Sequence, residues 1–181
     1  FNYLLDKEGS ACPVKFMRTP LTIQALLFFS LSMLPAVLFA QQVTTCTNPV
    51  GHAYFAHKGV LPKEDSGWKI DAVPKGAFTL RKLGKDDFDI IFIDSTKRNH
   101  STAQDGAKVF PLRRNETEAA FLVHYHDSEE SQIYSFFKEN SGAARLSILV
   151  SRGGPSIYKS SVMVGDCTPI DFKLINEGDS Q

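Results

Sequence analysis

Apolar and polar residues alternate in short runs along most of the chain after Gln41, and no long stretch there has helical periodicity. Alternation is typical of half-buried β-strands, because successive side chains point to opposite faces of the sheet. In the run from Glu118 to His126, this rule places Phe121, Val123 and Tyr125 on one face. The inward-facing residues that it predicts in two other runs are Phe78, Leu80, Leu146, Ile148 and Val150. The pattern predicts eight strands, at residues 52–58, 76–82, 88–94, 107–113, 118–126, 132–138, 145–151 and 161–164.

Short polar connections separate most of these runs, and they favour hairpins between successive strands. Turn-forming residues occupy 84–87, 115–116 and 140–142, and the pair Gly165 and Asp166 predicts another turn just before Cys167. The sequence therefore predicts an all-β fold, an antiparallel meander of seven or eight strands that closes fully or partly into a barrel. A β-sandwich is the alternative fold.

Some segments depart from regular alternation. The runs 88–94 and 134–137 are apolar at most positions, so either another segment covers their outer face or they form an exposed apolar patch. Segments 59–75 and 95–106 are longer than hairpin turns and interrupt the predicted meander. Residues 169–175 predict an additional edge strand after Cys167.

The segment from Met17 to Ala40 has the features of a secretory signal peptide. Arg18 supplies positive charge, residues 25–34 form an apolar core, Pro35 interrupts it, and Ala40 is a small residue at the expected cleavage position. Cleavage there gives a mature chain that begins at Gln41. The alternative is an uncleaved membrane anchor, but the apolar stretch is shorter than the about 20 residues that a spanning helix needs.

The predicted signal peptide divides the chain into three parts. Residues 17–40 are the signal peptide, and residues 41–181 form a single all-β domain. A signal peptide acts from the N-terminus, so we predict that residues 1–16 are a non-native upstream extension. The expected location is secreted or periplasmic, with no stable membrane span after cleavage.

Charge and motif content argue against several classes of function. The chain has 20 basic and 20 acidic residues and a formal net charge of zero, which gives no electrostatic attraction to nucleic acid or to an anionic membrane. The sequence has no serine-hydrolase elbow, zinc-protease motif or phosphate-binding loop. We therefore expect no nucleic-acid partner and no cofactor.

Cys46 and Cys167 are the two cysteines of the predicted mature domain, and an even number of cysteines in an exported chain favours a disulfide. Their pairing would enclose about 120 residues, and loop-closure entropy gives such a link an ideal stabilisation of about 4–5 kcal/mol. The alternative is a pair of free thiols or metal ligands.

A second candidate for chemistry is the pair His124 and His126. Two residues apart on a strand, their imidazoles project from one face and are able to converge on one metal ion. The third ligand would come from His52, His57 or Asp127. The alternative interpretation is a pair of surface histidines on a solvated strand face.

Basic and aromatic residues near the predicted loops are candidates for ligand binding. Lys97, Arg98 and Arg113 are placed to bind an anionic ligand, or they are ordinary solvated charges. Trp68 is the only tryptophan, and the sequence favours a role as a core plug at the point where the chain re-enters the fold. Its alternative role is the aromatic wall of a ligand pocket.

These observations favour a small exported binding module without enzymatic activity, whose partner is a small molecule or an envelope protein. This hypothesis is based on the runs 88–94 and 134–137, which are apolar on both faces of the strand, and on the long segment 59–75. One alternative is a metal-dependent or hydrolytic enzyme that uses His124 and His126. A structural or assembly subunit, with an apolar outer face as its interface, is the other.

Overall fold

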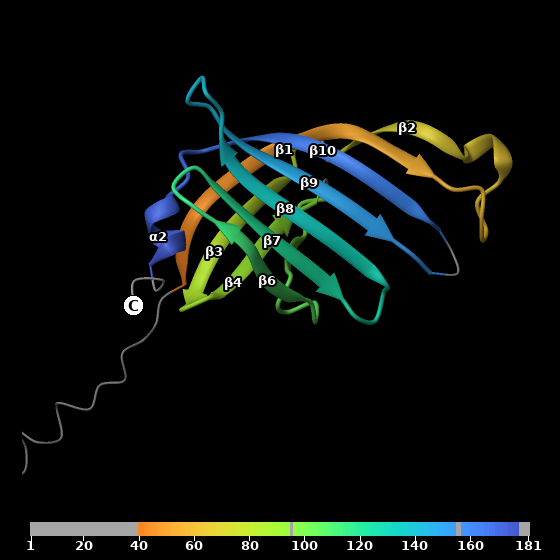
Figure 1. Ribbon diagram of the computed structural model, residues 1–181. Coiled ribbons are helices and arrows are strands. Elements are labelled where there is room, and N and C mark those ends of the chain that lie inside the picture. Colours follow the sequence, from red (N-terminus) through yellow and green to blue (C-terminus); the bar gives the residue numbers. More distant parts are fainter. Residues whose placement is uncertain (1–39, 95, 155–156, 178–181) are drawn as a thin grey trace, which may run out of the picture. The chain divides into compact units, whose positions relative to one another are not determined.

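A computed structural model describes residues 40–94, 96–154 and 157–177 (Figure 1). The predicted upstream extension, and the predicted signal peptide apart from Ala40, lie outside these residues. In the part of the chain that is described, no helix combines the length and the apolar character needed to cross a membrane.

Ten strands, one 3-10 turn and one short helix make up the described chain. In chain order they are β1 Gln41–Phe55, η1 Lys63–Asp65, β2 Gly67–Ala72, β3 Ala77–Gly84, β4 Asp87–Ile93, β5 Asn99–Ser101, β6 Lys108–Arg114, β7 Glu118–Tyr125, β8 Glu130–Lys138, β9 Ala144–Arg152, β10 Lys159–Cys167 and α2 Phe172–Asn176.

All strands pair antiparallel in one sheet, which curls into a half-barrel (Figure 1). The strand order is β5-β4-β3-β1-β10-β9-β8-β7-β6, and β2 pairs with β1 beside this path. Two meanders, β3 to β5 and β6 to β10, are thus joined through β1. The predicted all-β antiparallel fold with a partly closed barrel is confirmed.

Strand β1 holds the two meanders together because it changes partner along its length. Its first half pairs with β3 and its second half with β2, while β10 runs along its other side. The register with β10 shifts between Thr47 and Val50. Beyond the shift, an added Cβ at Gly51 would lie 1.8 Å from the carbonyl oxygen of Val162, so only glycine allows this close approach.

A disulfide fixes the same pair of strands. Cys46 and Cys167 lie directly opposite each other in β1 and β10 and are bonded, 121 residues apart in the sequence. The predicted pairing is confirmed. The predicted turn at Gly165 and Asp166 is wrong, because both residues belong to β10. A Cβ at Gly165 would lie 2.9 Å from the carbonyl oxygen of Thr47, so this glycine instead allows β10 to approach β1 closely.

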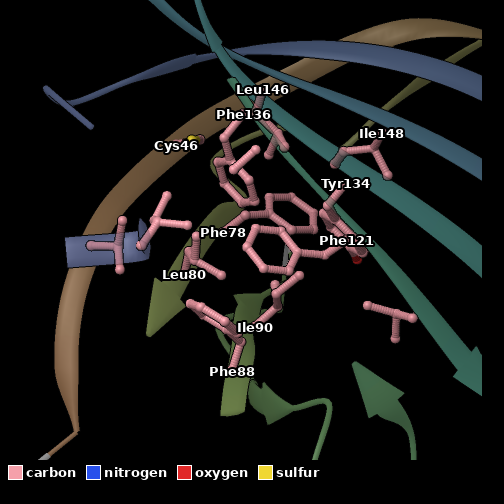
Figure 2. Packing of buried hydrophobic residues seen from close by; sticks show 14 of the residues in the cluster. Cys46, Phe78, Leu80, Phe88, Ile90, Phe121, Tyr134, Phe136, Leu146 and Ile148 are labelled. Atoms are coloured by element: carbon pink, nitrogen blue, oxygen red, sulfur yellow. The ribbon is translucent and has the colours of Figure 1, made fainter. Parts of the chain in front are cut away.

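The core fills the concave face of the sheet with side chains from both meanders (Figure 2). Phe88 of β4 meets Phe121 of β7 with ring centroids 4.8 Å apart, and Phe121 meets Phe136 of β8 at 6.1 Å. The inward faces predicted from alternation are correct. The buried members are Phe78, Leu80, Phe121, Val123, Leu146 and Ile148, and Tyr125 and Val150 pack against them half-buried.

The helix α2 covers one end of this core, where an edge strand was predicted at residues 169–175. That prediction is wrong, because Asp171 caps a helix there by accepting a hydrogen bond from the Leu174 amide at 3.0 Å. Phe172 and Ile175, three residues apart, form its buried face. Buried Lys82 donates from Nζ to the carbonyl oxygens of Leu174 and Glu177, at 2.7 and 2.6 Å, and so satisfies the helix C-terminus.

The doubly apolar run 88–94 is explained in part by a covering segment. Residues 101–103 fold over β4, and buried Asp89 accepts hydrogen bonds there from the hydroxyls of Ser101 and Thr102 and the amide of Ala103. Arg81 completes the set at 2.9 Å. Burial alone would raise the pKa of the Asp89 carboxyl, but these hydrogen bonds outweigh it and hold the pKa below its usual value.

Candidate ligand cavity

The half-barrel encloses a cavity of about 430 Å³ at the end of the core remote from α2. Its apolar wall comes from strands that are far apart in the sequence: Val73, Phe78, Phe92, Ile148, Val150 and Met163. Its polar wall is formed by Asp94, Asp105, Tyr125, Ser128, Glu130, Gln132, Tyr134 and Arg152. Figure 2 shows two of the deeper residues, Tyr134 and Ile148, on the side of the cluster away from Leu80.

The apolar wall follows from the alternation in β3, β9 and β10. Phe78, Ile148 and Met163 occupy inward positions and are 6%, 2% and 6% exposed. Phe92 stacks on Phe78 with ring centroids 6.0 Å apart and extends the wall toward the open end. This arrangement gives a smooth apolar surface that is able to hold a hydrocarbon group.

A chain of hydrogen bonds runs along β8 on the opposite wall. Glu130, Gln132 and Tyr134 share the inward face because they are two residues apart. Gln132 donates from Nε2 to Glu130 Oε1 at 2.5 Å, and the buried Tyr134 hydroxyl donates to the side-chain oxygen Oε1 of Gln132. Burial raises the pKa of the Tyr134 phenol, so it stays a donor.

Arg152 compensates the buried carboxylate in this chain. Glu130 is only 6% exposed, and the guanidinium of Arg152 donates from Nε to its Oε2 at 2.6 Å. The second guanidinium contact, from Nη2 to the same oxygen, is 2.5 Å. The pair is therefore a fixed, neutralised part of the wall.

The rim of the cavity carries two further carboxylates around one histidine. Asp94 lies 3.8 Å from His100 Nε2, and Asp105 lies 3.5 Å from His100 Nδ1. The imidazole stacks on Phe92 at 4.7 Å between ring centroids, which fixes the ring plane. Burial, together with the negative charges of Asp105, Glu130 and Asp89, raises the pKa of the neighbouring Tyr125 phenol to about 12.

The residues singled out for ligand binding from the sequence lie outside this cavity. Lys97 and Arg98 are exposed in the turn between β4 and β5, where the Arg98 amide donates to Asp94 Oδ1 at 3.0 Å. Arg113 is exposed on β6 and pairs with Glu118. Their role in binding a ligand stays a prediction.

Trp68 is 72% exposed, so the predicted role as a core plug is wrong. It lies on β2, which the sequence analysis treated as part of an irregular segment, and its ring meets that of Tyr54 edge-on at 5.5 Å. Trp68 instead borders a shallow groove of about 360 Å³ on the outer face of the sheet. Four serines also line the groove: Ser131, Ser151, Ser160 and Ser161.

The outer face carries a row of aligned apolar residues. Strand register places the following residues side by side across seven strands: Ile70, His52, Val162, Leu149, Ile133, Leu122 and Phe110. We call this set the outer row. Ile70, Val162 and Leu149 are 76%, 51% and 41% exposed, which is unusual for large apolar side chains in register.

The histidine pair lies on the outer side of the sheet, away from the cavity. The ring centroids of His124 and His126 are 6.3 Å apart, and His124 Nδ1 lies 3.0 Å from the Ser131 hydroxyl. Within residues 40–94, 96–154 and 157–177, no group of three or more His, Cys, Asp or Glu side chains is close enough to hold a metal ion. Metal binding by this pair stays a prediction.

Comparisons of the chain with protein-family models, with curated proteins and with solved structures give no match. Sequence reasoning missed the polar wall of the cavity, although Glu130 and Gln132 occupy positions that alternation assigns to the same face as Tyr134.

Proposed function

We propose that the protein is a binding protein without enzymatic activity that holds a small amphipathic molecule in the cavity of the half-barrel. The observation that carries this proposal is the cavity itself, with one apolar wall and one wall of fixed polar groups. Its volume of about 430 Å³ falls in the range of small-molecule sites, about 300–1,000 Å³.

The lining chemistry supports binding rather than hydrolysis. Among the described lining residues there is no histidine, cysteine or lysine, so Ser128 has no imidazole or amine in the lining to activate it as a nucleophile. The Glu130 carboxylate is engaged by Arg152 and Gln132, so it is not free to accept a proton from a substrate. The two histidines of the enzyme alternative face away from this lining.

The test is a fluorescence titration with the uncharged probe N-phenyl-1-naphthylamine. Met163 lines the cavity and its neighbour Val162 borders the outer groove, so the two positions form a matched pair. We expect saturable binding to the wild type, a loss of at least about tenfold in affinity for Met163→Trp, which fills the cavity, and no change for Val162→Trp. Probe binding that both variants leave intact would rule out the cavity as the site.

We also propose that the protein is exported before it binds its ligand, to a secreted or periplasmic location. The disulfide between Cys46 and Cys167 supports this, because such bonds persist in oxidising compartments. The leader pattern at residues 17–40 supports it as well. Mass spectrometry of the exported protein is expected to give an oxidised chain that begins at Gln41, whereas a reduced cytosolic chain would contradict the proposal.

The outer row favours a second candidate function, assembly with another copy of the same chain. In a two-fold interface the same surface of each copy meets. Because most of the outer row is apolar, two copies are able to pack there without bringing like charges together. We expect Leu149→Asp to convert a dimer to a monomer in sizing chromatography with light scattering. The control Val60→Asp, exposed outside the row, is expected to remain dimeric, and a monomeric wild type would exclude this function.

A further inference from the structure

The charge of the cavity lining is unbalanced. Three carboxylates and one guanidinium contribute to the lining. Arg152 is bonded to Glu130, so these two charges cancel within the wall. The two remaining carboxylates, Asp94 and Asp105, both lie at the rim and have no lysine or arginine side chain beside them in the lining.

Both rim carboxylates have acceptor capacity to spare. Asp94 uses Oδ1 for hydrogen bonds from the amide and hydroxyl of Thr96, at 2.8 and 2.7 Å, and from the Arg98 amide. These bonds, led by the Thr96 hydroxyl, hold the pKa of the Asp94 carboxyl below its usual value, so the group is ionised. Among the described residues, the ion-pair contact of its Oδ2 is with His100 Nε2, at 3.8 Å.

His100 is unable to satisfy both carboxylates in its neutral form. A neutral imidazole has a single N–H donor, whereas Asp94 and Asp105 lie toward different ring nitrogens, at 3.8 and 3.5 Å. At least one carboxylate oxygen therefore stays available to a ligand. The Phe92 ring stacks on the His100 imidazole and also lines the cavity, so the apolar wall extends up to the rim.

The Tyr125 phenol lies close to the rim and to its negative charges. Burial is the first cause of its raised pKa, and the charges of Asp105 and Glu130 add to it. Lys97 and Arg98 are nearby in sequence, but both are exposed and neither contributes to the lining.

We propose that the ligand class of this cavity is the amphipathic amines, with the protonated nitrogen at the rim beside Asp94 or Asp105 and the hydrocarbon part along Phe92, Phe78 and Ile148. This inference rests on the proposed binding function and specifies its ligand. An ammonium group donates up to three hydrogen bonds, so it is able to use the free acceptor positions of a rim carboxylate. A carboxylate ligand finds no unpaired guanidinium in the lining and meets like charges at the rim.

The test compares three ligands that share one tail. Decylammonium, decanol and decanoate displace N-phenyl-1-naphthylamine from the wild-type protein at neutral pH, where the amine is protonated and the acid ionised. We expect decylammonium to bind about 10- to 100-fold more tightly than decanol, because charge-assisted hydrogen bonds are stronger than neutral ones. Decanoate is expected to bind more weakly than decanol.

The double variant Asp94→Asn/Asp105→Asn locates the preference. Asparagine keeps the Oδ1 acceptor that Thr96 and Arg98 use, so the turn is retained while both charges are removed. The ratio of the decanol and decylammonium dissociation constants, both measured on the variant, is expected to fall to about 1. Asp127→Asn is the matched control on the neighbouring turn outside the lining, and it is expected to keep the wild-type ratio.

The outcomes separate this inference from the proposed function. Failure of the neutral probe to bind would overturn the binding function itself. Tight probe binding with no preference for decylammonium, or with a preference for decanoate, would overturn the amine inference and leave the function standing. A preference that persists in the double variant would overturn the assignment to Asp94 and Asp105.

Discussion

Glu130 of β8 and Arg152 of β9 lie directly opposite each other in the sheet, and the guanidinium donates to the buried carboxylate at 2.6 Å inside the half-barrel. This cross-strand pair shapes the binding site in two ways. It fixes a polar wall against the apolar one, and it removes the only guanidinium of the lining from contact with a ligand.

Arg152→Ala is expected to destabilise the protein more than removal of an exposed arginine. The variant leaves the Glu130 carboxylate, 6% exposed, without its cation, at a cost of about 1–3 kcal/mol in the free energy of unfolding. Arg113→Ala, which breaks an exposed pair with Glu118, is expected to cost less than about 1 kcal/mol. Urea denaturation measures both, and equal losses would contradict the role of the buried pair.

Asp89→Asn is expected to lower the free energy of unfolding by about 2–4 kcal/mol at neutral pH, because the carboxylate accepts four hydrogen bonds under residues 101–103. The pKa of Asp89 is lowered in the folded state. Its stabilising contribution is therefore fully present above the unfolded value of about 3.9 and is lost as the pH falls through the lower folded value. The difference in free energy of unfolding between the wild type and Asp89→Asn is expected to be smaller below pH 4 than at pH 7, as measured by denaturation curves at both pH values. A difference that is constant with pH would argue against an ionised Asp89.

Tyr125 is expected to lower the stability of the protein as the pH rises, whereas the contribution of Asp89 is lost as the pH falls. Its pKa is raised to about 12 in the folded state, so the folded protein keeps this proton while the unfolded chain releases it near pH 10. The folded state binds more protons in that window, and stability falls as the pH rises from about 10 to about 12. After a discount for solvent screening the loss is about 1–2 kcal/mol. Tyr125→Phe is expected to reduce this decline, and the part that remains is expected from buried Tyr134, whose pKa is also raised.

The double variant Cys46→Ala/Cys167→Ala is expected to fold with reduced stability. The disulfide connects residues 121 apart, and constraint of the unfolded chain gives an upper limit of about 4–5 kcal/mol for its contribution. Cys46 is fully buried, so reductant alone is expected to act slowly on the native protein and quickly in urea. Unfolding free energies that are equal with and without the bond would contradict its structural role.

Alternation along the sequence was sufficient to assign the inward faces of the central strands, because burial of one face repeats every second residue. It was insufficient for β1 and β2. The first half of β1 is polar and rich in threonine, and Thr44 is buried through hydrogen bonds to Thr168 rather than through apolar packing. In β2, alternation groups Trp68 with Ile70 correctly, but that shared face is the exposed one.

The candidate site was less predictable than the fold for a related reason. Asp94, Asp105, Tyr125 and Arg152 come together only through the curl and register of the sheet, which local patterns do not specify. The polar wall along β8 left a trace in the sequence, since Glu130 and Gln132 interrupt an apolar face. The basic residues that attracted attention, Lys97, Arg98 and Arg113, lie in exposed positions outside the cavity.

Methyl NMR during titration with N-phenyl-1-naphthylamine tests the central claim most directly, because an aromatic ligand shifts the signals of the methyl groups that it touches. If the cavity is the binding site, the methyl signals of Val73, Ile148 and Met163 shift and saturate with the probe. Those of Leu122, Leu149 and Val162 on the outer face remain unchanged. Shifts confined to the outer set, or no shifts in the cavity set at saturating probe, would contradict the account.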